Sequence, residues 1–368
     1  MAVQDHRVAV LIPAFNEGKQ IGEVLDTIPD FIDDIVVVND ASTDDTAAVV
    51  RQRRDRDPRI SLIDLEENRG VGGALAQAYM WARDHGVDIA VTIDGDGQMD
   101  PNEILDLIAP IVHGVADYTK GNRLTSPESW KPIPAIRLLG NSILSLFTKI
   151  VSGYWGVADS QTGFTAASRY ALQHIDWGAM YPRYGRPNDV LIMANVADCR
   201  VADVPVTARY GIGEQSSMKI LKVTFAISWL LFRRFWWRLF HKYVLRDFHP
   251  LVFFYILSAI TALVSAGLFV RLIVKWAADG FVPQMTALAL AFFAITTLQS
   301  LFFAMWMDME TNKELAVRVG RRPPPTPVEP TPVLDSAELR LQPPSDADDA
   351  DEPDASGSAR RSERSPQT

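Results

Sequence analysis

The sequence predicts an α/β domain built on a mainly parallel sheet and followed by a membrane-binding region. Short runs rich in Val and Ile alternate with helical patterns through the first part of the chain. Continuous apolar strands between helices are typical of a parallel sheet covered on both faces. Later, two long runs carry no charge, and about 20 apolar residues suffice to span a bilayer. The expected regions are a catalytic domain at 1–218, an interfacial amphipathic helix at 219–248, two transmembrane helices at 249–310 and a disordered, acidic, Pro-rich tail at 311–368.

Composition excludes some functions. The chain has 368 residues and a formal net charge of -9, so it lacks the basic character of a general nucleic-acid-binding protein. The single cysteine, Cys199, cannot form an intrachain disulfide. The first apolar run is short and is interrupted by Pro13, unlike a secretory signal. We therefore expect the chain to start in the cytoplasm.

Polar clusters follow the predicted strands of the first domain. The strands are expected within RVAVLIPAF, DIVVVND, ISLIDLEE, DIAVTIDGDG and DYTKGNRL. The clusters are Asn16-Glu17, Asn39-Asp40, Glu67-Asn68 and Asp94 to Asp100. Ligands of parallel α/β sheets bind beyond the carboxyl ends of the strands. Helix capping is the alternative explanation for the first two clusters, because Asn, Ser, Thr and acidic residues favour helix entries.

The most informative cluster is TIDGDGQMDP. Asp94, Asp96 and Gln98 offer hard oxygen ligands on one turn, as Mg²⁺ or Mn²⁺ would require. Gly95 and Gly97 permit a sharp turn and a close ligand approach. A solvated acidic turn is the alternative. The placement at the end of a core strand, beside other polar clusters, favours the metal interpretation.

The carboxyl-terminal part is expected to bind a membrane. Residues 251–270 and 285–307 are uncharged and predict two transmembrane helices. The preceding segment mixes basic residues with tryptophans, which suits a helix in the headgroup region; a third buried helix of the soluble domain is the alternative. Basic residues outside the two spans outnumber those in their connecting loop. The positive-inside rule therefore places the catalytic domain and the tail in the cytoplasm of a two-span membrane protein.

The ordered set PAFNEG, VVVNDASTDDT, NRGVGGAL, DGDGQMDP, GNR and DSQTGF resembles a family 2 glycosyltransferase of the GT-A fold. The resemblance covers roughly residues 7–220. Within this family the chain is most similar to the dolichol-phosphate mannosyltransferase and polyprenyl-phosphate hexosyltransferase branch. It implies metal-dependent, inverting transfer of a hexose from a nucleotide sugar, of the GDP-mannose or UDP-glucose type, to dolichyl or polyprenyl phosphate. The implied partners are the donor, the lipid acceptor and the bilayer.

The resemblance also implies roles for particular residues. The donor-binding residues are expected to be Pro13, Phe15, Glu17, Val38, Asp40, Asp94 and Arg123. Asp94, Asp96 and Gln98 match the metal-binding triplet. Arg209 and Lys219 match a basic segment that closes over the phosphates, and these residue types suit phosphate recognition. Asp96, Asp159 and Asp189 match active-site carboxylates.

Two positions depart from the family pattern. Asn39 stands where many relatives have aspartate, and Met99 stands where a histidine is frequent. The first departure leaves the donor base open. Two alternative functions are a polysaccharide synthase on the same fold and a non-catalytic membrane scaffold. The chain lacks the Q-x-x-R-W motif of such synthases, and the intact acidic triplet argues against a scaffold.

Overall fold

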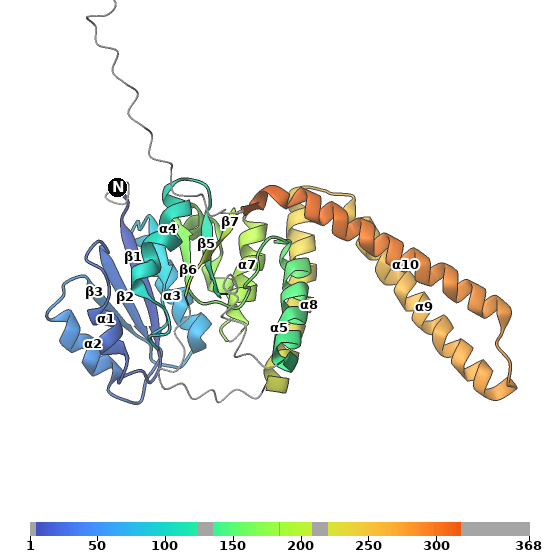
Figure 1. The fold of residues 1–368 in the computed structure, drawn as a ribbon, viewed down its shortest axis with the longest axis horizontal. Helices are drawn as coiled ribbons and strands as arrows, with labels where there is room; N and C mark the ends of the chain where they lie inside the picture. Colours follow the sequence, from blue (N-terminus) through green and yellow to red (C-terminus); the bar gives the residue numbers. More distant parts are fainter. Residues whose placement is uncertain (1–4, 124–134, 184, 208–219, 318–368) are drawn as a thin grey trace, which may run out of the picture. The chain divides into compact units, whose positions relative to one another are not determined.

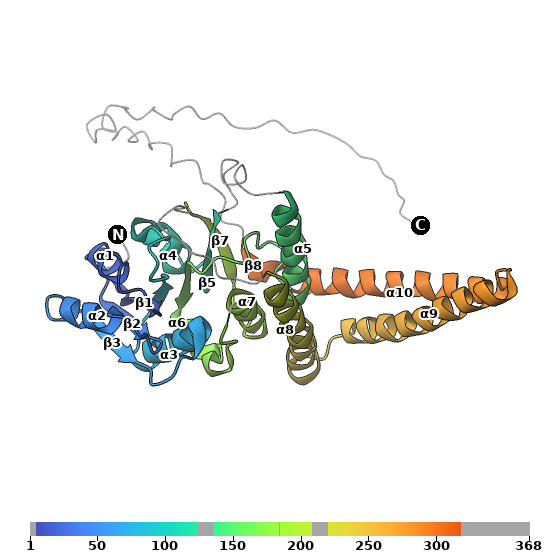
Figure 2. The same ribbon diagram turned by 90° about the horizontal axis from the view of Figure 1, so that it is seen from below.

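The computed structural model describes residues 5–123, 135–183, 185–207 and 220–317. Its sheet has the strand order β3-β2-β1-β4-β6-β5-β7-β8 (Figures 1 and 2). The strands are β1 (Val8–Ala14), β2 (Asp34–Asn39), β3 (Ile60–Asp64), β4 (Ile89–Thr92), β5 (Tyr118–Asn122), β6 (Thr165–Ser168), β7 (Val201–Pro205) and β8 (Ala316–Val317). All pairings are parallel except those of β6, which runs antiparallel to β4 and β5. The predicted α/β, GT-A-like class with a mainly parallel sheet is confirmed.

Helices cover both faces of the sheet. Their bounds are α1 (Ile21–Asp26), α2 (Thr46–Arg54), α3 (Gly70–Asp84), α4 (Ile104–Val112), α5 (Ala135–Ser152), α6 (Arg169–His174) and α7 (Arg186–Val196). One apolar cluster joins alternate residues of β1 and β2 to α3, α6 and α7. A second cluster joins the intervening residues of the same strands to α1, α2 and α4. The two clusters arise because successive strand side chains point to opposite faces.

Helix α8 (Ile220–Phe240) presents two different faces and continues into a π-helical segment, His241–Arg246. Ile227, Leu230 and Leu231 are buried and lie toward α5 and α7, which α8 contacts. Phe225 and Trp229 belong to an exposed apolar face. This arrangement suits the predicted interfacial helix, because one side is held by the domain while the other offers aromatic side chains.

The basic residues of α8 do not all face outward as a headgroup-binding helix would suggest. Arg233 is exposed, whereas Arg238 and Lys242 are buried. The Arg238 guanidinium forms a bidentate ion pair with Asp308, with Nη–Oδ distances of 2.7 and 3.0 Å. Lys242 donates hydrogen bonds to the Asn195 carbonyl at 2.8 Å and to Asn312 Oδ1 at 2.9 Å.

Two long apolar helices follow, α9 (Leu251–Asp279) and α10 (Gln284–Thr311). Both are long and apolar enough to cross a bilayer, and only 22% and 11% of their most apolar windows are buried. A core helix of a soluble protein would be mostly buried, so their exposure favours a lipid environment. After α10 the chain returns to the sheet, where β8 pairs with β7. The predicted tail, 311–368, lies outside the described residues from position 318 onward.

Candidate active site

The loops after β1 and β2 form one wall of the site at the carboxyl edge of the sheet. Pro13 and Val38 are register partners in β1 and β2. Asn16, with a left-handed φ of 57°, accepts a hydrogen bond from the Thr43 backbone N–H at 2.9 Å. The Glu17 backbone N–H donates to Thr46 Oγ1 at 2.9 Å. These bonds explain the polar sequence of both loops: the side chains cross-link the loops, whereas the N-cap residues of α1 and α2, Gln20 and Asp45, make no side-chain cap hydrogen bond.

Asp40 and Asn39 are buried at the end of β2. Asp40 Oδ1 accepts a 2.7 Å hydrogen bond from the Arg69 backbone N–H at the entry of α3. Asn39 Nδ2 donates to Asp64 Oδ1 at 2.9 Å. The amide at position 39 therefore has a clear structural role, because it can donate to a carboxylate where a second carboxylate could not. Phe15, by contrast, is 46% exposed.

The acidic loop after β4 lies against the first wall. A Cβ at Gly95 would lie 3.4 Å from the Pro13 carbonyl oxygen and 3.6 Å from Glu17 Cγ. Burial and, to a smaller extent, the negative charges of Asp96, Asp44 and Asp94 together raise the pKa of the Glu17 carboxyl to about 7. Neighbouring carboxylates that repel one another in this way are stabilised by a bound cation.

The acidic loop also has the chemistry that a divalent cation needs. Asp94 Oδ1 is buried without a hydrogen-bond partner among the described residues. Asp96 Oδ1 accepts from the Gln98 backbone N–H at 3.0 Å, which fixes the turn. The described residues contain no group of three or more His, Cys, Asp or Glu side chains placed to hold a metal by themselves. The donor set thus fits a cation that takes few protein oxygens and completes its shell with phosphate and water, as Mg²⁺ does.

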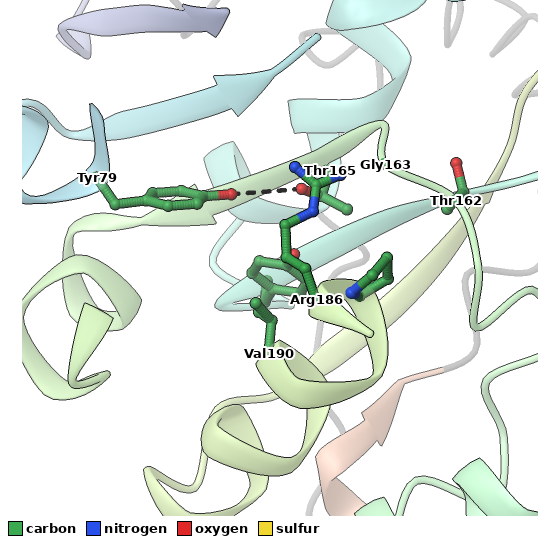
Figure 3. A pocket seen from close by; sticks show the side chains of 8 residues that line it. Tyr79, Thr162, Gly163, Thr165, Arg186 and Val190 are labelled. Carbon is green, nitrogen blue, oxygen red and sulfur yellow. Dashed lines mark hydrogen bonds between the residues drawn. The ribbon is translucent and has the colours of Figure 1, made fainter. Parts of the chain in front are cut away.

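A second wall comes from the segment between α5 and β6 and from the start of α7. Gly163 has no side chain, and a Cβ there would lie 2.7 Å from Asp94 Oδ2 and 2.8 Å from Arg186 Nη2. Arg186 Nη2 lies 3.9 Å from Asp94 Oδ1. Figure 3 shows the Arg186 side chain extending from α7 toward Thr165 and Gly163. The Tyr79 hydroxyl bonds Thr92 Oγ1 at 2.7 Å behind this wall.

Arg123 and Asp159, predicted separately from two motifs, form an ion pair. Arg123 Nε lies 2.8 Å from Asp159 Oδ2, and the Asp159 side chain is 4% exposed. Burial opposes ionisation of Asp159, but Arg123 and Lys120 together hold the pKa of its carboxyl below the ordinary value. Lys120 is itself buried and donates to the Thr162 carbonyl at 3.1 Å.

Asp189 is engaged by protein groups. Arg234 Nε of α8 lies 2.5 Å from Asp189 Oδ1, and the Tyr181 backbone N–H donates to Asp189 Oδ2 at 2.7 Å. Burial, the largest influence, raises the pKa of the Asp189 carboxyl despite the opposing effect of Arg234. The pair links α8 to the first turn of α7. Its predicted role as a catalytic carboxylate stays a prediction.

Beside this link is a cavity of about 390 Å³ between α8 and the segment before α7. Trp229, Arg233 and Trp237 contribute aromatic and cationic groups to its lining, next to Met180 and Pro182. Such a lining suits an amphiphile that carries an anionic group.

The predicted phosphate-binding residues Arg209 and Lys219 lie outside the described residues. Sequence reasoning missed the site roles of two buried cations, Lys120 and Arg186, and of the partly buried Arg234. The available signal was weak: Arg186 and Pro187 open a helix within GRPND, but only the aspartate of that stretch attracted a role.

Comparison with known proteins places this site in context. A family model described as Glycosyl transferase family 2 matches residues 9–176. The chain is 32% identical to a UDP-N-acetylglucosamine–dolichyl-phosphate N-acetylglucosaminyltransferase of Methanococcus voltae, over 56% of this chain and 87% of the relative. It is 28% identical to an undecaprenyl-phosphate mannosyltransferase of Micrococcus luteus, over 55% of this chain and 83% of the relative.

Further similarity is found to a third curated relative and to a solved structure. The chain is 26% identical to a polyprenol monophosphomannose synthase of Mycolicibacterium smegmatis, over 60% of this chain and 86% of the relative. Among solved structures it resembles glucosyl-3-phosphoglycerate synthase from Mycobacterium tuberculosis in complex with Mn²⁺ and UDP. That match has a TM-score of 0.49 and 20% identity, and covers 63% of this chain and 81% of the other.

Proposed function

The chain belongs to glycosyltransferase family 2 and is a glycosyltransferase of the polyprenyl- or dolichyl-phosphate hexosyltransferase kind, and on that premise we propose a specific reaction. The enzyme transfers one hexose-type sugar from a nucleotide sugar to a polyprenyl monophosphate at the cytoplasmic face of a membrane. The observation that carries this proposal is the acidic centre formed by Glu17, Asp94 and Asp96 at the carboxyl edge of the sheet.

The donor is proposed to bind along the first wall. The β1 and β2 loops would receive the nucleoside, with Pro13 and Val38 adjacent in the sheet. The diphosphate would then lie against the acidic loop, where Asp94, Asp96 and Gln98 would hold Mg²⁺ or Mn²⁺. The cation would supply charge neutralisation for the departing diphosphate.

The acceptor needs little activation, because a lipid monophosphate already carries an anionic oxygen. That oxygen attacks the anomeric carbon from the face opposite the leaving group as the bond to the departing diphosphate breaks. The configuration of the anomeric carbon is therefore inverted. Arg123 would orient a phosphate; its guanidinium is partly buried and held in direction by Asp159, which supports this role.

The lipid part of the acceptor is proposed to lie against the exposed faces of α8, α9 and α10. Arg238 of α8 and Asp308 of α10 are paired without exposure to solvent, and β8 returns to the sheet. Both outer ends of the apolar helices therefore adjoin the catalytic domain, which supports a two-span anchor with both ends in the cytoplasm.

Relatives share the acceptor class but differ in the sugar: their names specify N-acetylglucosamine in one case and mannose in others. The test is to incubate membranes containing the protein with radiolabelled UDP-N-acetylglucosamine, UDP-glucose or GDP-mannose, with Mg²⁺ and undecaprenyl or dolichyl phosphate. We expect label in the organic phase from one donor and none from Asp96→Ala. Label incorporated into a polymer would favour a polysaccharide synthase, and no transfer by a folded protein would contradict the proposal.

A further inference from the structure

We propose that Arg186 is a phosphate-binding residue of the catalytic centre, whose guanidinium takes an oxygen of the donor diphosphate or of the lipid monophosphate. The identity of these two phosphates rests on the proposed function. The chemistry that they share, an anionic phosphate oxygen, is what the geometry around Arg186 points to.

The first argument is burial without a full set of partners. Arg186 is 7% exposed, and its Nη1 is buried with no hydrogen-bond partner among residues that the structure describes. A buried guanidinium nitrogen without an acceptor is unfavourable, because its desolvation is not offset. An oxygen supplied by a ligand would remove this deficit.

The second argument is that neighbouring carboxylates do not satisfy Arg186. Asp94 Oδ1 lies 3.9 Å from Arg186 Nη2, which exceeds a hydrogen-bond distance, and this oxygen also lacks a partner within the described part of the chain. Asp189, one turn further along α7, is already paired with Arg234 at 2.5 Å. Arg186 and Asp94 thus face each other with one open position on each.

The third argument concerns the local electrostatic field. Lys120 lies near Arg186, and burial lowers the pKa of its ammonium group to about 8, with smaller opposing effects of Asp159 and Asp203, which raise it, and of Arg123 and Arg186, which lower it. Arg186 also opens α7, an 11-residue helix, where the helix dipole favours anions. The start of α7 and the Arg186 guanidinium therefore add a positive field beside Asp94 of the acidic loop.

The fourth argument is steric. Gly163 keeps the space between Asp94 and Arg186 clear, because any Cβ there would approach both side chains closer than 3 Å. The adjoining cavity has a volume of about 10 Å³ and is lined in part by Thr162, Thr165 and Arg186. A space of that size admits about one water-sized group, so a terminal phosphate oxygen fits and a larger group does not.

The guanidinium is well suited to this role. Its planar set of N–H donors can bind one or two phosphate oxygens while another N–H group stays directed toward Asp94. A metal held by Asp94 and a cation fixed at Arg186 would then contact the same phosphate region from two sides. Lysine at this position would keep the charge but lose the second donor direction.

The test compares wild type with Arg186→Met and Arg186→Lys, purified in detergent, by isothermal titration with Mg²⁺ and either UDP, GDP or the nucleoside alone. The Michaelis constant for undecaprenyl phosphate is measured in parallel. If Arg186 binds the donor diphosphate, Arg186→Met weakens binding of the cognate nucleoside diphosphate by about 10- to 100-fold and leaves nucleoside binding unchanged. If it binds the acceptor, the Michaelis constant for the lipid phosphate rises by a similar factor instead. Arg186→Lys is expected to lose less in either case.

Arg169→Gln provides a matched control, because this exposed arginine pairs with Asp88 at 3.0 Å and with the Gly86 carbonyl at 2.7 Å. These partners precede β4, whereas the acidic loop follows that strand. This variant should behave as wild type in every assay. Thermal unfolding monitors the fold of each variant, and Arg186→Lys decides the question if Arg186→Met does not fold.

The possible failures are distinguishable. This inference alone is overturned if wild type transfers sugar while both Arg186 variants keep the diphosphate affinity and the lipid-phosphate Michaelis constant within twofold of wild type. Selective loss of diphosphate binding in the variants, with no transfer by wild type to any lipid phosphate, upholds the phosphate site and overturns the proposed reaction. Absence of both binding and transfer in folded wild type overturns both.

Discussion

Two arginine–aspartate pairs in this molecule differ in how completely they are satisfied, one fully buried and one with its aspartate partly exposed. Arg238 and Asp308 make two hydrogen bonds, of 2.7 and 3.0 Å, with neither side chain exposed. Tyr243 and Asn312 also donate to Asp308 Oδ1, at 2.6 and 2.9 Å. Arg186 and Asp94 approach only to 3.9 Å.

The difference separates structural charge from charge reserved for a ligand. A buried ion pair is stable only when its geometry is good and its remaining donors and acceptors are bonded. The pair between α8 and α10 largely meets that condition and joins the apolar helices to the catalytic domain. The pair at the acidic loop does not meet it, so its open positions suit a metal–phosphate complex.

The largest expected effect comes from breaking the complete pair. Asp308→Ala would leave the Arg238 guanidinium buried without its counter-charge, and removing one partner of a buried pair costs about 3–5 kcal/mol. We expect the free energy of unfolding in detergent to fall by that amount. Chemical denaturation followed by tryptophan fluorescence measures it.

The matched control is the double variant Arg238→Met with Asp308→Leu, which removes both charges. It should recover part of the lost stability, because two apolar groups leave no unpaired charge. The recovery is incomplete because Tyr243 and Asn312 lose an acceptor. If Asp308→Ala unfolds at the same denaturant concentration as wild type, the pair does not join the two regions in the way described.

Breaking the incomplete pair should affect activity more than stability. Asp94→Asn removes one carboxylate charge that is not hydrogen-bonded at Oδ1, so little folding energy is lost. We expect sugar transfer to fall about 10²- to 10³-fold, as for loss of one electrostatic group at a reacting centre. Initial rates and melting temperatures are measured on the same preparation; a large drop in melting temperature would mean that Asp94 is structural after all.

Asp189 tests whether a third pair belongs with the first two. Because Asp189 is bonded to Arg234 and to the Tyr181 N–H, we expect Asp189→Asn to lower the free energy of unfolding by about 1–3 kcal/mol. A double-mutant cycle with Arg234→Met would show coupling between the two residues. Loss of turnover without loss of stability or coupling would instead support the catalytic role predicted from the sequence.

The smallest expected effect is a pH-dependent change at Glu17. The pKa of its carboxyl is raised from 4.5 to about 7 in the fold, so its ionisation destabilises the metal-free protein. This penalty is absent below about pH 4.5, grows between pH 4.5 and about 7, and is fully present above about pH 7. Without divalent cations, Glu17→Gln should therefore have a higher melting temperature than wild type at pH 8 and the same melting temperature at pH 4.5.

Added Mg²⁺ should reduce the pH 8 difference between wild type and Glu17→Gln, because the cation offsets the repulsion from Asp94 and Asp96. Glu23→Gln serves as a control for loss of a carboxyl in the same part of the chain. A melting difference that does not change with pH would show that Glu17 is unaffected by its acidic neighbours.

Much of the fold follows from local pattern. The apolar runs identified β1 to β5, and their uninterrupted Val and Ile content indicated a sheet buried on both faces. Strand β6 was not predicted, because Thr165–Ser168 reads TAAS and its burial comes from neighbours rather than from apolar character. The two apolar helices were predicted because their length and composition need no tertiary information.

The site was predictable only where a motif marks it. The resemblance to the family led to Arg123 and Asp159, and the structure shows that they pair with each other. The sequence does not indicate which residues lie beside Arg186 and Arg234. Arg234 is 45 residues from Asp189, and Arg186 lies in α7 whereas Asp94 follows β4. Contacts of this kind depend on packing, which the order of residues does not reveal.

The short strand β8 has a consequence for solubility. By pairing with β7, β8 covers part of a strand that would otherwise form the edge of the sheet. The N–H and C=O groups of an uncovered edge are available to another chain. A chain cut after Thr311 would keep both apolar helices but lose this cover. Its sheet would offer an open edge to neighbouring molecules, which favours edge-to-edge aggregation.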